Sequence, residues 1–192
     1  MQYLSCSFTG HRPSRFAFGF DEESAGCLSL KSALLSQIQG MCDRGVTTFL
    51  SGMALGTDLW AAEAVLALKK RGRPLRLVCV LPCETQADRW AECHRERYFS
   101  ILEGADEVLY ISCRYTPDCM ARRNRYLIDH SDFLIAVYDG GDRGGTAYTV
   151  DYARHRGRSI VVIDPATAAA APDLPHLTPG GKLPAGHLVL LS

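Results

Sequence analysis

The chain has 192 residues, 47% of them hydrophobic and 22% charged, and its formal net charge at pH 7 is zero. Such a chain can bury one sizeable core, and its neutrality gives no reason to expect a nucleic acid or an anionic membrane as partner. No apolar run approaches the ~20 residues of a membrane span, and the first residues do not resemble a signal peptide. We therefore expect a cytoplasmic protein without a membrane partner.

Short apolar runs alternate with segments of helical periodicity along most of the chain. The runs predict six strands, at residues 4–8, 46–50, 76–81, 107–112, 133–138 and 159–163. Five helices are predicted between them: one stopped by Gly45, one at 58–71, one opened by a capping box at Thr85 and Asp88, one capped at Thr116-Pro117, and one at 147–156. This alternation predicts an α/β fold with a doubly wound, mostly parallel sheet flanked by helices, a three-layer sandwich.

Two segments fall outside this alternation. Residues 14–25 show no clean period and are interpreted as a loop with exposed aromatic side chains. Residues 164–192 contain five of the nine prolines and predict a tail packed on a domain of residues 1–163, with a closing edge strand at Leu188–Leu191 as an option. The eight cysteines lack metal-ligand spacing, so we expect no metal and no cofactor. Four of them, Cys6, Cys42, Cys79 and Cys93, are interpreted as small buried hydrophobes, and Cys83 is the exception because it follows a strand where ligands bind.

A glycine-rich loop follows the strand predicted at 133–138. Its residues are Asp139, Gly140, Gly141, Asp142, Arg143, Gly144, Gly145 and Thr146. Glycines let the backbone approach a ligand closely, and Thr146 is placed to cap the next helix, whose free N–H groups and positive dipole end attract anions. The loop therefore predicts a phosphate site, against the alternative of a plain surface turn.

Other candidate residues follow neighbouring strands, where α/β sheets bind their ligands. They are Thr9, Gly10, His11 and Arg12 after the first strand, Gly52, Gly56, Thr57 and Asp58 after the second, and Pro82, Cys83, Glu84 and Gln86 after the third. Their convergence with the glycine loop indicates a site for a phosphate-bearing small molecule. His11 is interpreted either as a ligand contact or as a loop cap, and Trp60 and Trp90 as core residues rather than base-stacking platforms.

Several of these motifs together resemble the YpsA-like proteins of the SLOG superfamily. The motifs are Thr9 to Pro13, Gly52 to Glu63, Arg123-Asn124, Ser131-Asp132 and Asp139 to Thr146, and the match extends over residues 4–163. That superfamily also contains the DNA-processing protein DprA (Smf) and the LOG phosphoribohydrolases. The resemblance implies a Rossmann-like fold that binds nucleotides or nucleotide-derived molecules.

The comparison with LOG enzymes separates binding from catalysis. Their Met-x-x-Arg-Lys motif is similar to Met120 to Asn124, with Asn124 in place of the lysine, which adds Arg123 and Asn124 to the expected ligand contacts. Their glycine loop ends in two glutamates, and Tyr148 and Thr149 occupy those positions here. The resemblance therefore implies a phosphate site without the LOG catalytic carboxylate, and no catalytic residue is assigned.

Three functional hypotheses follow. The first is a sensor or binding protein for a nucleotide-derived phosphorylated ligand, of the nucleoside monophosphate or ADP-ribose class, with at most weak catalysis. The second is an N-glycosidic phosphoribohydrolase of LOG type. The third is a DprA-like single-stranded nucleic-acid-binding protein, which the zero net charge disfavours. A homodimer is a further hypothesis.

Overall fold

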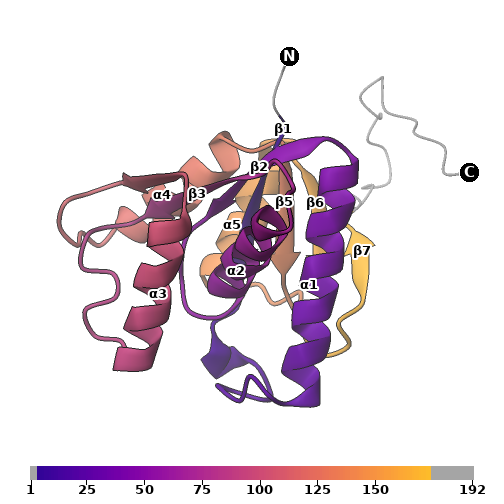
Figure 1. Cartoon of the computed structure of the whole chain (residues 1–192), viewed down its shortest axis with the longest axis horizontal. Coiled ribbons are helices and arrows are strands. Elements are labelled where there is room, and N and C mark those ends of the chain that lie inside the picture. The colour runs from indigo at the N-terminus through magenta and orange to yellow at the C-terminus, as the bar shows by residue number, and fades with distance from the viewer. Residues whose placement is uncertain (1–3, 174–192) are drawn as a thin grey trace, which may run out of the picture.

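A sheet of seven strands runs through the computed structural model, which describes residues 4–173 (Figure 1). Its strand order is β4-β3-β2-β1-β5-β6-β7. The strands are β1 (Leu4–Gly10), β2 (Val46–Ser51), β3 (Arg76–Leu81), β4 (Glu107–Tyr110), β5 (Phe133–Val137), β6 (Ser159–Ile163) and β7 (Ala170–Pro172). The first six pair in parallel, and β7 lies antiparallel to β6.

Helices cover both faces of this sheet. They are α1 (Ala25–Asp43), α2 (Thr57–Lys70), α3 (Glu92–Gly104), α4 (Cys119–Asp129) and α5 (Gly145–His155), with a short 3-10 helix, η1, at Pro13–Arg15. In Figure 1, α1, α2 and α3 lie on the near face, and α4 and α5 lie on the far face. This arrangement confirms the predicted Rossmann-like, three-layer α/β architecture.

The strands are buried on both faces, as their continuous apolar runs predict. In β5, Ile135 and Val137 join the core cluster under α1 and α2, and Leu134 and Ala136 alternate with them toward α5. The strand order changes direction at β1, which lies between β2 and β5. In such sheets the carboxyl ends at the switch point form the ligand crevice, and there the β1 and β5 loops meet.

Three helix starts differ from their predictions. Residues 84–89 form turns, and α3 begins only at Glu92, because the Thr85 carbonyl accepts the Asp88 N–H in a turn instead of opening a helix. The Thr116 hydroxyl donates to the Asp118 carboxylate at 2.7 Å, and α4 starts after Asp118. The predicted caps at Thr85 and Thr116 are therefore wrong.

The predicted cap at Thr146 is also wrong. Gly144 precedes α5, and its φ of 102° is a left-handed conformation that favours glycine. Thr146 lies one position inside the helix and is 8% exposed. The helix therefore begins two residues earlier than the sequence indicates, within the glycine loop.

Further differences from the predictions concern the loop at 14–25, Cys93 and the C-terminal edge of the sheet. The loop at 14–25 does not expose all its aromatic side chains, since Phe16 is buried and stacks on Trp60, although Phe20 is 57% exposed. Cys93 is exposed because it lies on the outer side of α3, contrary to its predicted burial. Strand β7 was not predicted, and the strand proposed at 188–191 lies outside the described residues. No helix within residues 4–173 combines the length and apolar character that crossing a bilayer requires.

Candidate functional site

Two adjoining pockets open at the carboxyl edge of the sheet. The smaller has a volume of about 340 Å³ and the larger about 670 Å³. Four residues, Arg12, Ala54, Met120 and Arg123, line both, so the two pockets form one cleft. Ten predicted site residues line the smaller pocket: Thr9, Gly10, His11, Arg12, Asp58, Arg123, Asn124, Gly144, Gly145 and Thr146.

The N-terminus of α5 closes one side of the smaller pocket. Gly144 and Gly145 bring backbone to the pocket wall, and a side chain at Gly145 would meet only Asn124 Nδ2, at 3.9 Å. The first-turn N–H groups of a helix have no partner within the helix and carry its positive dipole end. This geometry suits an anion, with Asn124 and Arg143 on the same wall.

Arg123 and Asp58 form a buried ion pair at the floor of the cleft. Arg123 Nη1 lies 3.2 Å from Asp58 Oδ2, and the side chains are only 7% and 8% exposed. Burial raises the pKa of Asp58 against the opposing guanidinium, and burial likewise lowers the pKa of Arg123. The Asp58 carboxylate also accepts the Ala54 N–H at 3.3 Å, so the pair fixes the loop between β2 and α2.

Three predicted glycines make close internal contacts that leave no space for a side chain. A Cβ on Gly10 would lie 2.3 Å from Thr57 Oγ1, and one on Gly52 would lie 1.4 Å from Arg123 Nη1. Gly56 has a φ of 89° and packs against Pro13. The lining of the cleft does not include Gly52, Gly56 or Thr57. These residues support the lining residues by packing against them.

Backbone strain marks the loop after β2. Met53 is buried with a φ of 58°, a conformation that costs about 1–3 kcal/mol outside glycine and clusters at functional sites. Its N–H donates to the Ser51 hydroxyl at 3.1 Å, and its carbonyl accepts the Gln86 amide at 2.6 Å. These bonds hold the strained turn against the wall of the larger pocket.

Asp139 joins the loop after β5 to the loop after β1. Its carboxylate lies 3.0 Å from His11 Nε2 and accepts hydrogen bonds from Arg15 at 3.0 and 3.2 Å. Burial raises the pKa of Asp139, but hydrogen bonds from the Gly141 N–H, Arg15 and His11 outweigh it and lower the pKa to about 2. Asp139, Gly140 and Gly141 do not line either pocket, so Asp139 acts as a clamp that positions His11 beside the smaller one.

The larger pocket is built mainly from residues that the site prediction omitted. It is lined by Cys83, Thr85, Gln86, Asp88, Arg89, Trp90 and Tyr115 in addition to the four shared residues. The misplaced start of α3 hid most of them, because the segment was expected to be helical. Pro82 is buried and Glu84 exposed, and neither lines the cleft, whereas Gln86 and Cys83 follow the same strand and do.

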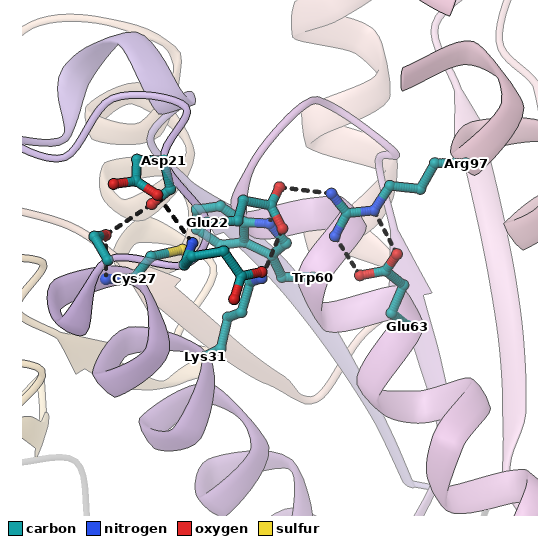
Figure 2. Close-up of polar contacts among 9 residues, drawn as sticks. Asp21, Glu22, Cys27, Lys31, Trp60, Glu63 and Arg97 are labelled. Atoms are coloured by element: carbon teal, nitrogen blue, oxygen red, sulfur yellow. Dashed lines mark hydrogen bonds and ion pairs between the residues drawn. The ribbon is translucent and has the colours of Figure 1, made fainter. Parts of the chain in front are cut away.

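A polar cluster anchors the segment that follows η1 in the chain. Figure 2 shows Glu22 between Arg97, Lys31 and Trp60, with Arg97 turned also toward Glu63. The Glu22 carboxylate accepts from Trp60 Nε1 at 2.9 Å, from Lys31 at 2.6 Å and from Arg97 at 2.6 Å. The cluster joins residues far apart in the sequence and anchors the chain between η1 and α1 against α2 and α3.

The positions of the LOG glutamates lie away from the cleft. Tyr148 is 38% exposed, and its hydroxyl accepts a hydrogen bond from Arg125 Nε at 2.5 Å. Thr149 is fully buried and donates to the Gly145 carbonyl at 2.7 Å. Neither side chain lines the pockets, and neither offers a carboxylate.

The amino-acid sequence is similar to those of a known protein family and of several bacterial proteins. The sequence model of the YspA SLOG family (YpsA) matches residues 6–165. A UPF0398 protein of Halalkalibacterium halodurans is 33% identical over 152 residues, which cover 78% of this chain and 80% of that protein. A UPF0398 protein of Bacillus cereus strain G9842 is 33% identical over 152 residues, which cover 78% of this chain and 82% of that protein. A UPF0398 protein of Bacillus thuringiensis strain Al Hakam is 32% identical over 151 residues, with the same coverage of both chains.

Proposed function

Since the chain belongs to the YspA SLOG family, we propose that it binds a nucleotide or nucleotide-derived phosphorylated ligand in the cleft at the carboxyl edge of its sheet. The observation that carries this proposal is the N-terminus of α5, with Gly144 and Gly145, on the wall of a pocket that Arg12 and Asn124 also line. Backbone N–H groups, a positive dipole end and a guanidinium together are the groups that bind phosphate.

The charges of the smaller pocket support the same ligand. Arg12 and Arg143 line it, and neither forms an ion pair with another described residue. Asp58, the carboxylate on this wall, is already paired with Arg123. An excess of unpaired guanidinium groups in a chain of zero net charge favours an anionic ligand there.

The proposed role is that of a binding or sensor protein with at most weak catalysis. Cleavage of an N-glycosidic bond needs a general acid that protonates the departing base, and a carboxyl group commonly fills this role. Tyr148 and Thr149 offer none and lie outside the cleft. The lack of a carboxylate at these two positions disfavours the LOG-type hydrolase.

A thermal-shift screen tests the proposal. Saturation at ~100 times the dissociation constant stabilises a folded protein by ~2.7 kcal/mol, which raises its melting temperature measurably. We expect a shift with AMP, ADP or ADP-ribose and none with the unphosphorylated nucleosides. If no phosphorylated compound shifted the melting temperature, the proposal would fail. A shift with single-stranded DNA that disappears steeply as salt rises would instead favour the DprA-like hypothesis.

A further inference from the structure

The two pockets differ in charge and lining, and we propose that they divide one ligand between them: a nucleoside diphosphate, or a nucleotide joined through a diphosphate, with its base in the larger pocket and its diphosphate in the smaller. This inference rests on the proposed function. It adds where the base lies, and it adds that the preferred ligand carries two phosphates rather than one.

The two pockets have volumes of about 670 and 340 Å³. Pockets that hold small ligands have volumes of ~300–1,000 Å³, so each of these two is large enough for a separate chemical group. The shared wall of Arg12, Ala54, Met120 and Arg123 makes the passage between them continuous. A ligand that fills both must therefore have two parts joined by a linker that passes Arg12.

The charges of the two pockets indicate which pocket binds the diphosphate and which binds the base. The smaller pocket has Arg12, Arg143 and the α5 N-terminus, with its carboxylate, Asp58, already neutralised. Two guanidinium groups balance the charge of about −2 on one phosphate monoester, and the α5 N-terminus adds hydrogen-bond donors for a second phosphate. In the larger pocket, Arg89 is accompanied by Asp88, so its own charges balance apart from the shared arginines. The diphosphate therefore belongs in the smaller pocket, and an uncharged group in the larger.

The lining of the larger pocket suits a flat aromatic group. Tyr115 is 64% exposed and available for stacking, and Trp90 is held edge-to-face against Tyr98 with ring centroids 5.3 Å apart. Stacking of a base on an aromatic side chain contributes about 1–3 kcal/mol. Met120 adds an adaptable apolar surface at the boundary with the smaller pocket.

Gln86 lines the larger pocket and is held in one orientation. The Gln86 amide nitrogen donates to the carbonyls of Met53 and Gly52, at 2.6 and 3.4 Å, which fixes the orientation of the amide. Its Oε1 atom is buried and has no hydrogen-bond partner among the described residues. Because this acceptor is buried and the amide is held in place, Gln86 shapes the wall of the larger pocket rather than binding the base.

Calorimetric titration of the full chain with AMP, ADP, GMP, GDP and inorganic pyrophosphate tests the assignment. We expect a nucleoside diphosphate to bind at least tenfold more tightly than its monophosphate, and Arg143→Ala to remove most of that difference. Arg95→Ala is the matched control, because Arg95 is an exposed arginine of α3 outside both pockets. Its effect on the ratio should be negligible.

Tyr115→Ala tests the base end. It should weaken the nucleotides by at least fivefold and leave pyrophosphate binding unchanged, and Tyr110→Ala, a change at another half-exposed tyrosine outside the cleft, should alter neither. Equal affinities for mono- and diphosphates, or nucleotide binding indifferent to Tyr115→Ala, would overturn the inference and leave the proposed function standing. Absence of binding by every nucleotide would overturn both.

Discussion

The guanidinium of Arg123 fills the space that a side chain at Gly52 would need. A Cβ atom on Gly52 would lie 1.4 Å from Arg123 Nη1 and 2.9 Å from Asp58 Oδ2. The buried ion pair therefore requires glycine at position 52. The turn after β2 passes close to the floor of the cleft, and any side chain at this position would displace Arg123. Gly52 is thus a packing requirement of the site rather than a direct ligand contact.

Gly52→Ala should lower the free energy of unfolding by about 3–5 kcal/mol, the cost typical of disrupting a buried ion pair. Urea denaturation measures it. Gly40→Ala is the control, since Gly40 lies in the exposed face of α1 with nothing within 4 Å of its Cβ position, and helix propensity should make it about 1 kcal/mol more stable. An unchanged urea midpoint for Gly52→Ala would show that Arg123 does not need its observed position.

Gly145→Val should abolish binding of a phosphorylated ligand while the protein remains folded. The Cβ position at Gly145 has only Asn124 Nδ2 nearby, so the fold tolerates a side chain, but the branched side chain would occupy the approach to the helix N-terminus. Calorimetric titration with ADP measures binding, and Gly40→Val supplies a helix-glycine control remote from the cleft. Undiminished affinity in folded Gly145→Val protein would remove the phosphate from this loop.

The Glu22 cluster predicts a pH dependence of stability. Burial raises the pKa of Glu22, but hydrogen bonds from Arg97, Lys31 and Trp60 outweigh it and lower the pKa from 4.5 to about 2. Because the folded-state pKa is the lower one, this carboxylate stabilises the fold fully above the unfolded-state pKa. That stabilisation decreases as the pH falls from about 5 toward 2, by at most about 1.4 kcal/mol for each unit of pKa difference.

Glu22→Gln should therefore be less stable than the wild type at pH 7 and lose less stability on transfer to pH 3. Urea denaturation at both pH values measures the two differences. Glu84→Gln is the control, because Glu84 is exposed and forms no ion pair with another described residue. Parallel pH dependences for Glu22→Gln and the wild type would show that the ionised Glu22 carboxylate does not stabilise the fold.

The wild-type protein should release little or no adenine from AMP. General acid–base help is worth about 10²–10⁴-fold, and the positions that supply it in LOG enzymes carry Tyr148 and Thr149. Thr149 is fully buried, so Thr149→Glu would bury a charge and destabilise the fold. Tyr148→Glu should be as inactive as the wild type, because position 148 lies outside the cleft, and chromatographic detection of free base measures both. Rapid adenine release by the wild type would show that another group in the cleft performs catalysis.

The sequence predicts the sheet and one end of the cleft well, for physical reasons. Strands buried on both faces appear as continuous apolar runs, and the residues after β1 and β5 meet because parallel strands present their carboxyl ends at one edge. The prediction is weaker where local signals mislead. Thr85 and Asp88 have the spacing of a capping box but form a turn, and this error concealed the larger pocket.

Long-range polar contacts could not be predicted from residue patterns. Glu22 and Arg97 lie 75 positions apart, and Arg123 and Asp58 lie 65 apart, so no periodicity connects them. The tight space at Gly52 is likewise a property of the folded turn. Sequence spacing indicates which elements meet, and the packed structure decides which side chains line the cleft and which support it.

The central claim is that the cleft recognises the phosphate group of its ligand. Titration of AMP and adenosine into wild-type and Arg12→Ala protein tests it most directly. Arg12 is exposed at the junction of the two pockets and forms no ion pair with another described residue, so its removal should leave the fold intact. A charge-assisted hydrogen bond contributes about 1.5–3 kcal/mol, so Arg12→Ala should weaken AMP by roughly 10- to 150-fold. Adenosine should bind far more weakly and be unaffected by the substitution. Equal affinities of AMP and adenosine for the wild type, or equal losses of both in Arg12→Ala, would contradict the claim.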